Sequence, residues 1–195
     1  MTLTTVYGHL QNRSMHSLAT VSMGGRDGDL VILFGGATTG EPRMSALGDT
    51  WLLAASHGSR WYPHHFNTTV VPGTTIEHAA SPPARWGQSM ACQGAPAGPL
   101  KKGFCMMFGG GVTQDDHFAD TWRFDLGEFK EAHGWKLVVP VQTPTTTPPL
   151  GLPAGRWSYQ LAACGGGALM ATGSTGYRVC TDDTCMMRPP PHLRP

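Results

Sequence analysis

Charged side chains are scarce in this sequence. Asp, Glu, Lys and Arg make up 14% of its 195 residues, and the formal net charge is +1. The sequence has no basic cluster beyond Lys101-Lys102, whereas proteins that bind nucleic acid usually carry a broad positive patch. We therefore expect no nucleic-acid partner.

Long hydrophobic runs are also missing. No stretch approaches the roughly 18 uninterrupted apolar residues of a membrane helix, so we expect no membrane insertion. Residues 1–18 do not pair a basic segment with an apolar one, as a signal peptide would. Five cysteines are too few for a disulfide scaffold. We expect an intracellular location rather than secretion, although an internal segment of a secreted protein would share these features.

The sequence also lacks the spacing of apolar residues that is typical of helices. No window combines apolar residues at helical spacing with good helix formers over three turns. The 26 glycines and 16 prolines favour many turns, and a hydrophobic content of 40% is enough for a core. The composition thus argues against long helices and for many turns.

An internal repeat is what the sequence does contain. The apolar run "CMMFGGG", which begins at Cys105 and ends at Gly111, is followed by "ADTW", which begins at Ala119. The earlier run "VILFGG", which begins at Val31, is followed by "GDTW". Fixed landmarks return at separations of 71 to 74 residues: the arginines Arg13, Arg85 and Arg156, the glycine pairs Gly35-Gly36 and Gly109-Gly110, the aspartates Asp49 and Asp120, and the tryptophans Trp51, Trp122, Trp61 and Trp135.

This order of landmarks resembles the kelch repeat: an arginine-led first strand, an apolar strand ending in Gly-Gly, an Asp-Thr-Trp strand and a final tryptophan. The resemblance covers residues 13 to 185 and implies an all-β fold, a β-propeller of four-stranded antiparallel blades. It divides residues 1–195, as one partial propeller, into blade one (13–71), blade two (85–141), an incomplete blade three (156–185) and a proline-rich tail (186–195). Two features depart from the family: the unit exceeds the usual length of about 50 residues, and the third unit has no Asp-Thr-Trp.

The implied strands can be placed on the sequence. Blade one would have strands near 15–22, 30–35, 49–54 and 60–71, and blade two near 86–92, 103–109, 119–125 and 135–141. Blade three would have strands near 157–164 and 167–173, and a third near 177–181.

The landmark residues have structural explanations. Glycine pairs let the backbone bend where a Cβ would collide. The four tryptophans would fill the space between adjacent blade faces. Each arginine lies just before an innermost strand, where its guanidinium would bond loop carbonyls. We therefore interpret all of these residues as structural.

Candidate chemistry is sparse. Neither His64-His65 nor the run Asp115-Asp116-His117 supplies the four converging ligands of a structural zinc site, so we predict no metal. Cys180 and Cys185 are separated by four residues, unlike the usual CxxC redox or zinc pair. The ligands of the copper oxidases that share the kelch fold have no motif here. We expect no catalytic residue and no cofactor.

Binding is the function that remains. The extra length of each repeat lies in loops at one end of the implied blades, at residues 37–48, 67–84, 110–118 and 142–155. We expect a non-catalytic kelch-type module that acts as a scaffold or adaptor within a larger assembly and holds a protein partner on these loops. The alternative is a fragment of a propeller enzyme, galactose oxidase-like or other, with active-site residues outside this chain.

One cysteine pair has a predicted geometry. In a register that pairs Met90 with Met107, Cys92 and Cys105 face each other on adjacent antiparallel strands. Cβ atoms in such pairs lie roughly 4.5–5.5 Å apart, so a disulfide needs a small local adjustment. We predict proximity, and a bond where the compartment is oxidising.

Completeness is the final expectation. Two blades and part of a third do not make a closed ring of 4–8 blades. The outer faces would expose apolar side chains such as Phe34, Trp51 and Leu161. We therefore expect either a segment of a longer propeller or an assembly in which another chain supplies the missing blades.

Overall fold

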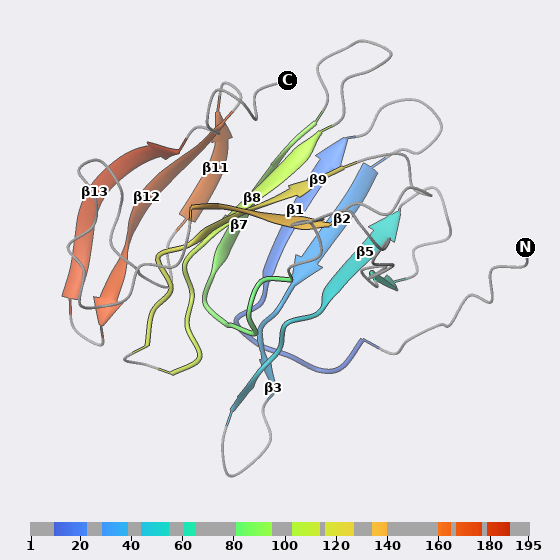
Figure 1. Cartoon of the computed structure of the whole chain (residues 1–195), viewed down its shortest axis with the longest axis horizontal. Coiled ribbons are helices and arrows are strands. Elements are labelled where there is room, and N and C mark those ends of the chain that lie inside the picture. The colour runs from blue at the N-terminus through green and yellow to red at the C-terminus, as the bar shows by residue number, and fades with distance from the viewer. Residues whose placement is uncertain are drawn as a thin grey trace, which may run out of the picture.

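The structure is a computed structural model of the chain (Figure 1). It describes residues 10–22, 29–38, 44–54, 61–64, 81–94, 103–113, 116–126, 134–139, 160–164, 167–176 and 179–187. The regular elements of this described part are β-strands, which pair antiparallel in sheets. The all-β fold class is therefore as the sequence predicts.

The first sheet has four strands in the order β1-β2-β5-β6. They are β1 (Ser17–Ser22), β2 (Asp29–Phe34), β5 (Thr50–Ala54) and β6 (Trp61–His64). β1 alternates between buried and exposed residues, as a strand with one covered face does. The four strands agree with the predicted positions to within a few residues, except that residues 65–71 of the fourth lie outside the described residues.

The second sheet repeats this arrangement in the order β10-β9-β8-β7. Its strands are β7 (Ser89–Gln93), β8 (Phe104–Phe108), β9 (Thr121–Asp125) and β10 (Trp135–Val139). β8 is buried at every position because both faces of the sheet are covered there. β8 and the glycines after it contain the stretch "CMMFGGG". Gly109 and Gly110 directly follow the strand and have positive φ angles of 66° and 84°.

The third sheet contains β11 (Gln160–Cys164), β12 (Gly167–Gly176) and β13 (Val179–Met187) in sequential order. β13 is longer than the strand predicted near 177–181. Its centre, "CTDDTC", lacks the apolar alternation that marks a half-buried strand, so the sequence signal was weak. The register between β12 and β13 shifts twice, between Ala171 and Gly173 and between Ser174 and Gly176.

A short ladder interrupts the predicted loop 37–48. β3 (Ala37–Thr38) pairs with β4 (Ser45–Ala46), and Ala37 also bridges Ser14. Figure 1 shows β3 at the end of the molecule where β1 begins and β2 ends. The first part of the predicted loop 37–48 is thus tied to the segment before β1.

The hydrophobic core described by the structure lies between the first and second sheets. Ile32 and Phe34 of β2 belong to the same buried cluster as Met107 of β8. Trp135 is fully buried in this cluster, with its ring centroid 5.4 Å from Phe34 and 5.1 Å from Phe124. Its indole Nε1 also donates to Thr50 Oγ1 at 2.9 Å. One residue of the second sheet therefore joins both sheets by packing and by a hydrogen bond.

The burial of Phe34 and Trp51 corrects one expectation. Both were expected on exposed outer faces, but Phe34 faces the second sheet and is fully buried. Trp51 is buried as well, and its indole donates to the Asp49 carboxylate. Leu161 is partly buried. The alternation along β2 explains the error for Phe34, because Leu33 rather than Phe34 pairs with Trp51 on the opposite face.

The first strand of each sheet lies beside the next. β7 contacts β1 on one side and β11 on the other. Gln88 Nε2 donates to the carbonyl of Phe34 at 2.8 Å, and the amide of Leu161 donates to Ser89 Oγ at 3.1 Å. Each sequence repeat therefore contributes one sheet, and the first strands of the three sheets are neighbours.

Candidate functional site

The recurring arginines and aspartates form ion pairs at the same end of both four-stranded sheets. In the first repeat, Arg13 Nη1 and Nη2 donate to the two carboxylate oxygens of Asp49 at 2.6 and 2.8 Å, and Trp51 Nε1 donates to Asp49 Oδ2 at 2.5 Å. Arg13 Nη1 also reaches the carbonyl of Gly35 at 3.1 Å. We call this group the Arg13–Asp49–Trp51 cluster.

The second repeat contains the same group. Arg85 donates to both oxygens of Asp120 at 2.5 and 2.7 Å, and Trp122 Nε1 donates to Asp120 Oδ2 at 2.6 Å. Arg85 Nη1 also bonds the carbonyl of Gly109 at 2.9 Å. The guanidinium thus reaches a loop carbonyl in both repeats, as predicted. The third arginine, Arg156, lies outside the described residues.

The sequence did not predict the role of the aspartate in each ion pair. Asp49 and Asp120 were recognised as repeat landmarks, but not as the ion-pair partners of Arg13 and Arg85. A bidentate arginine–carboxylate pair fixes two side chains in one plane, and the indole bond adds the adjacent strand. Each cluster therefore joins the residue before the first strand to the beginning of the third strand of its sheet.

The electrostatics of the two clusters differ. The side chains of Arg85 and Asp120 are both 0% exposed, whereas the Asp49 side chain is 40% exposed. Burial alone would raise the pKa of the Asp49 carboxyl. The hydrogen bonds from Arg13 and Trp51 outweigh burial and hold this pKa below its ordinary value of 3.8.

Backbone hydrogen bonds join the loops of the first repeat to the start of the second. The amide of Gly36 donates to the carbonyl of Arg85 at 2.9 Å, and the amide of Arg85 donates to the carbonyl of Leu47 at 3.0 Å. The amide of Gly87 donates to the carbonyl of Met15 at 2.9 Å. The two repeats are therefore fastened at this end by main-chain hydrogen bonds.

Glycine is required at Gly36 in this arrangement. Its φ is +100°, and an added Cβ would lie 2.7 Å from the carbonyl oxygen of Ser14. This close approach lets the segment before β1 lie against the end of β2.

We call this surface the loop end, comprising described residues 13–16, 35–38, 44–49, 84–88, 109–113 and 116–120. Large apolar side chains are exposed on it at Met15, Met44 and Val112. Met15 also has a φ of 54°, rare for a residue with a side chain. Of the loops predicted to bind a partner, residues 39–43, 67–80, 114–115 and 142–155 lie outside the described residues.

A cavity of about 310 Å³ opens where the first strands of the three sheets begin. It is lined by residues of equivalent position in the repeats: His16, Ser17, Leu18, Gln88, Ser89, Met90 and Leu161. Among these, His16 is the titratable residue, and burial together with the nearby Arg13 charge lowers the pKa of its imidazole. Gln88 donates through Nε2 to Phe34 O and Ser17 Oγ, while its Oε1 is buried without a partner. The cavity is thus polar and nearly uncharged.

The residues considered for metal binding do not converge. In the part of the chain that the structure describes, no group of three or more His, Cys, Asp or Glu side chains is arranged to hold a metal ion. The His64 ring packs edge-on against Phe124, with centroids 5.2 Å apart. His65 and Asp115 lie outside the described residues.

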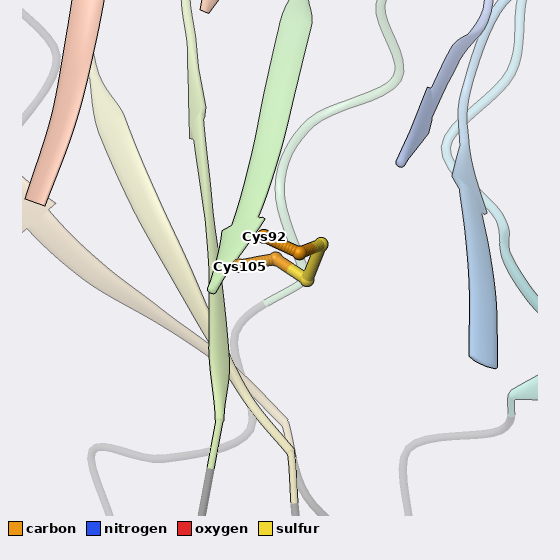
Figure 2. The surroundings of a disulfide bond; sticks show 2 residues. All are labelled: Cys92 and Cys105. Atoms are coloured by element: carbon orange, nitrogen blue, oxygen red, sulfur yellow. A yellow bond between two sulfur atoms is a disulfide. The ribbon is translucent and has the colours of Figure 1, made fainter. Parts of the chain in front are cut away.

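The cysteines of the second sheet are joined by a disulfide. Cys92 on β7 pairs with Cys105 on β8, in the predicted register that also pairs Met90 with Met107. The Cα atoms are 3.9 Å apart, and Figure 2 shows the bridge connecting the two adjacent strands. Cys105 is fully buried in the core between the first and second sheets.

Comparison with known proteins does not assign the chain to a family. No protein-family model matches the chain, and no curated protein matches it significantly. Among the described residues, no helix is long and apolar enough to cross a membrane.

Proposed function

We propose that this chain is a non-catalytic protein-interaction module, a kelch-type sector of a β-propeller that binds a protein partner through its loop end. Each repeat would form one blade, and the three first strands would lie nearest the propeller axis. The repeated sheet order and the side-by-side first strands support this arrangement.

The hydrogen bonds and ion pairs of the loop end are the observation that carries the proposal. A surface that binds protein with little loss of entropy must be held in shape before the partner arrives. Both arginine–aspartate–tryptophan clusters lie at this end, as do the backbone bonds between Gly36, Leu47 and Arg85. The same surface exposes Met15, Met44 and Val112. Methionine is a common contact residue at adaptable protein interfaces.

The cavity at the first strands supports binding over catalysis. Acid–base mechanisms commonly use two titratable groups with opposed pKa shifts, and His16 is the titratable residue among those lining this cavity. The alternative of an enzyme fragment would require reactive groups from outside this chain.

The test compares partner capture by matched variants. Met44→Lys and Val112→Lys change the loop end, and Leu137→Lys changes an exposed leucine on β10, which is not among the loop-end residues. The tagged full chain and each variant are expressed in cells of the source organism, and the captured proteins are quantified by mass spectrometry. We expect both loop-end variants to lose the same partners at least fivefold, while Leu137→Lys retains them. Equal capture by all three variants would contradict the proposal.

A further inference from the structure

Met15 and Gly87 occupy equivalent positions in the first two repeats. Each lies two residues after the landmark arginine, Arg13 or Arg85, and two residues before the first strand of its sheet. The third counterpart, Ser158, lies outside the described residues. The backbone φ is 54° at Met15 and 69° at Gly87. Both angles lie in the left-handed region, which glycine adopts readily and residues with a Cβ adopt rarely.

Methionine is an unfavourable residue at this position. In the left-handed conformation the Cβ of an L-residue crowds the following carbonyl oxygen, and glycine avoids this contact. Among the described residues, Met15 is the single non-glycine residue with a positive φ. Residues held in such conformations cluster where proteins bind or react. The side chain of Met15 therefore needs an explanation in what it contacts.

Packing within the chain does not explain this methionine. Met15 is 49% exposed, and it is not part of the buried cluster that the structure describes between the first and second sheets. Its carbonyl makes the bond to the second repeat, by accepting from the amide of Gly87 at 2.9 Å, and a glycine would keep that bond. A flexible thioether side chain provides adaptable apolar surface for a partner. Exposure and backbone conformation together are those of a contact residue.

Met15 adjoins the polar cavity. It directly precedes His16, and its hydrogen-bond partner Gly87 directly precedes Gln88. Both His16 and Gln88 line the cavity. The volume of about 310 Å³ is at the lower end of the range for small-molecule sites, about 300–1,000 Å³. We therefore expect the cavity to admit one side chain of a partner rather than a folded segment.

The cavity offers hydrogen bonds and almost no charge. Ser17, Gln88 and Ser89 bring hydroxyl and carboxamide groups to it. The strands β1, β7 and β11 are edge strands of their sheets, so they also present backbone amides and carbonyls. Burial and the nearby Arg13 charge lower the pKa of the His16 imidazole, which is therefore neutral at pH 7. A charged group entering the cavity would lose its hydration without meeting an opposite charge.

We infer that Met15 is the contact residue by which the loop end recognises its partner, and that the partner places an apolar side chain against Met15 and a neutral polar side chain in the adjoining cavity. The neutral side chain is serine, threonine, asparagine or glutamine. This inference rests on the proposed loop-end binding and names the part of that surface which the partner contacts. Burial of the exposed methionine supplies affinity, and hydrogen bonds in the cavity supply specificity.

Met15→Gly separates a contact role from a structural one. Relief of the left-handed conformation offsets the greater freedom of glycine in the unfolded chain, so we expect an unchanged or higher urea midpoint of unfolding. Met44→Gly removes another exposed methionine, at a residue without a positive φ, and should lower the midpoint. Partner capture by the tagged full chain should fall at least about fivefold in Met15→Gly, whereas Met15→Leu, of similar volume, should retain it.

The outcomes distinguish this inference from the proposed function. A Met15→Gly chain that captures the same partners as wild type would overturn the inference, while loss of capture by Met44→Lys and Val112→Lys would still support loop-end binding. A clear fall in the urea midpoint of Met15→Gly would also overturn it, because the side chain would then be structural.

A photo-cross-linking amino acid at position 15 identifies the partner segment. The same amino acid at position 137 is the control, and linked peptides from cells of the source organism are identified by mass spectrometry. We expect links to the captured partners from position 15 and not from position 137. Replacing the neutral polar residue of the linked segment by aspartate or lysine should then weaken capture at least about tenfold. Equal linking from both positions, or a segment that binds through a charged residue instead, would overturn the inference.

Discussion

The aspartate of each of the first two repeats is the residue on which the loop end depends. Asp49 and Asp120 each accept two guanidinium bonds and one indole bond. A buried carboxylate is tolerated only when such bonds replace its lost hydration. The difference in exposure between the two aspartates makes them a natural comparison, because their partners and geometry are the same.

We predict that Asp120→Asn destabilises the protein more than Asp49→Asn. Removing the Asp120 charge leaves the buried Arg85 guanidinium unpaired, which costs about 3–5 kcal/mol of unfolding free energy. The loss at Asp49 should be clearly smaller, because water reaches that carboxylate. Urea unfolding monitored by tryptophan fluorescence measures both variants, and equal losses would contradict this account of the two clusters.

We also predict a loss of stability in acid that depends on Asp49. Because its pKa is lower in the folded than in the unfolded chain, its contribution is complete above about pH 4 and declines as pH falls through the folded-state pKa. Asp125 behaves in the same way. Burial raises its pKa, but the hydrogen bond from Lys136 and the charge of Arg123 outweigh burial and lower it.

The measurement is the free energy of unfolding between pH 2.5 and pH 6. Wild type should lose stability below pH 4, and Asp49→Asn should lose less over the same interval. A variant whose pH profile runs parallel to that of wild type would show that Asp49 does not titrate differently on unfolding.

At the scale of strands, much of the arrangement was predictable. The repeats located the strands of the first two sheets, and the register assumed for the cysteine pair, with Met90 opposite Met107, is the register observed. The β3–β4 ladder was not predicted, because two-residue strands leave no periodic signal. The full extent of β13 was missed because its sequence is polar at the centre. The Arg–Asp pairing joins residues 35 or 36 positions apart, and residue spacing alone does not reveal which side chains meet.

We predict that the disulfide between β7 and β8 adds measurable stability. It closes a loop with a sequence separation of 13 residues, which limits the unfolded chain and contributes about 2–4 kcal/mol. The double variant Cys92→Ala/Cys105→Ala should be less stable by this amount in oxidising buffer, and should match the reduced wild type. Peptide mapping without reduction provides the control: free alkylation of both cysteines in the native, oxidised protein would contradict the assigned bond.

At the scale of the whole molecule, the sequence predicts apolar side chains without packing partners on the outer faces of the first and third sheets. Exposed Leu18 on the first sheet and exposed Ala162 on the third are consistent with this, whereas Phe34 and Trp51 are not, because both are buried. The exposed apolar side chain in this row of the first sheet is therefore Leu18 on β1, whereas its neighbours Leu33 and Trp51 are buried.

We predict that residues 1–195 expressed alone bind an apolar dye such as ANS, or associate. Solubility, mass and thermal unfolding are measured on the same preparation. A soluble monomer with a cooperative melt and no dye binding would contradict the expectation that the chain needs further blades or a partner chain.

The central claim is that the loop end holds a protein partner. Cross-linking mass spectrometry of the tagged chain, purified with its bound proteins from cells of the source organism, tests it most directly. We predict that links to other proteins concentrate on residues 37–48, 67–84, 110–118 and 142–155. Links concentrated on residues 93–102 and 126–134, the loops at the opposite end of the second sheet, would contradict the claim.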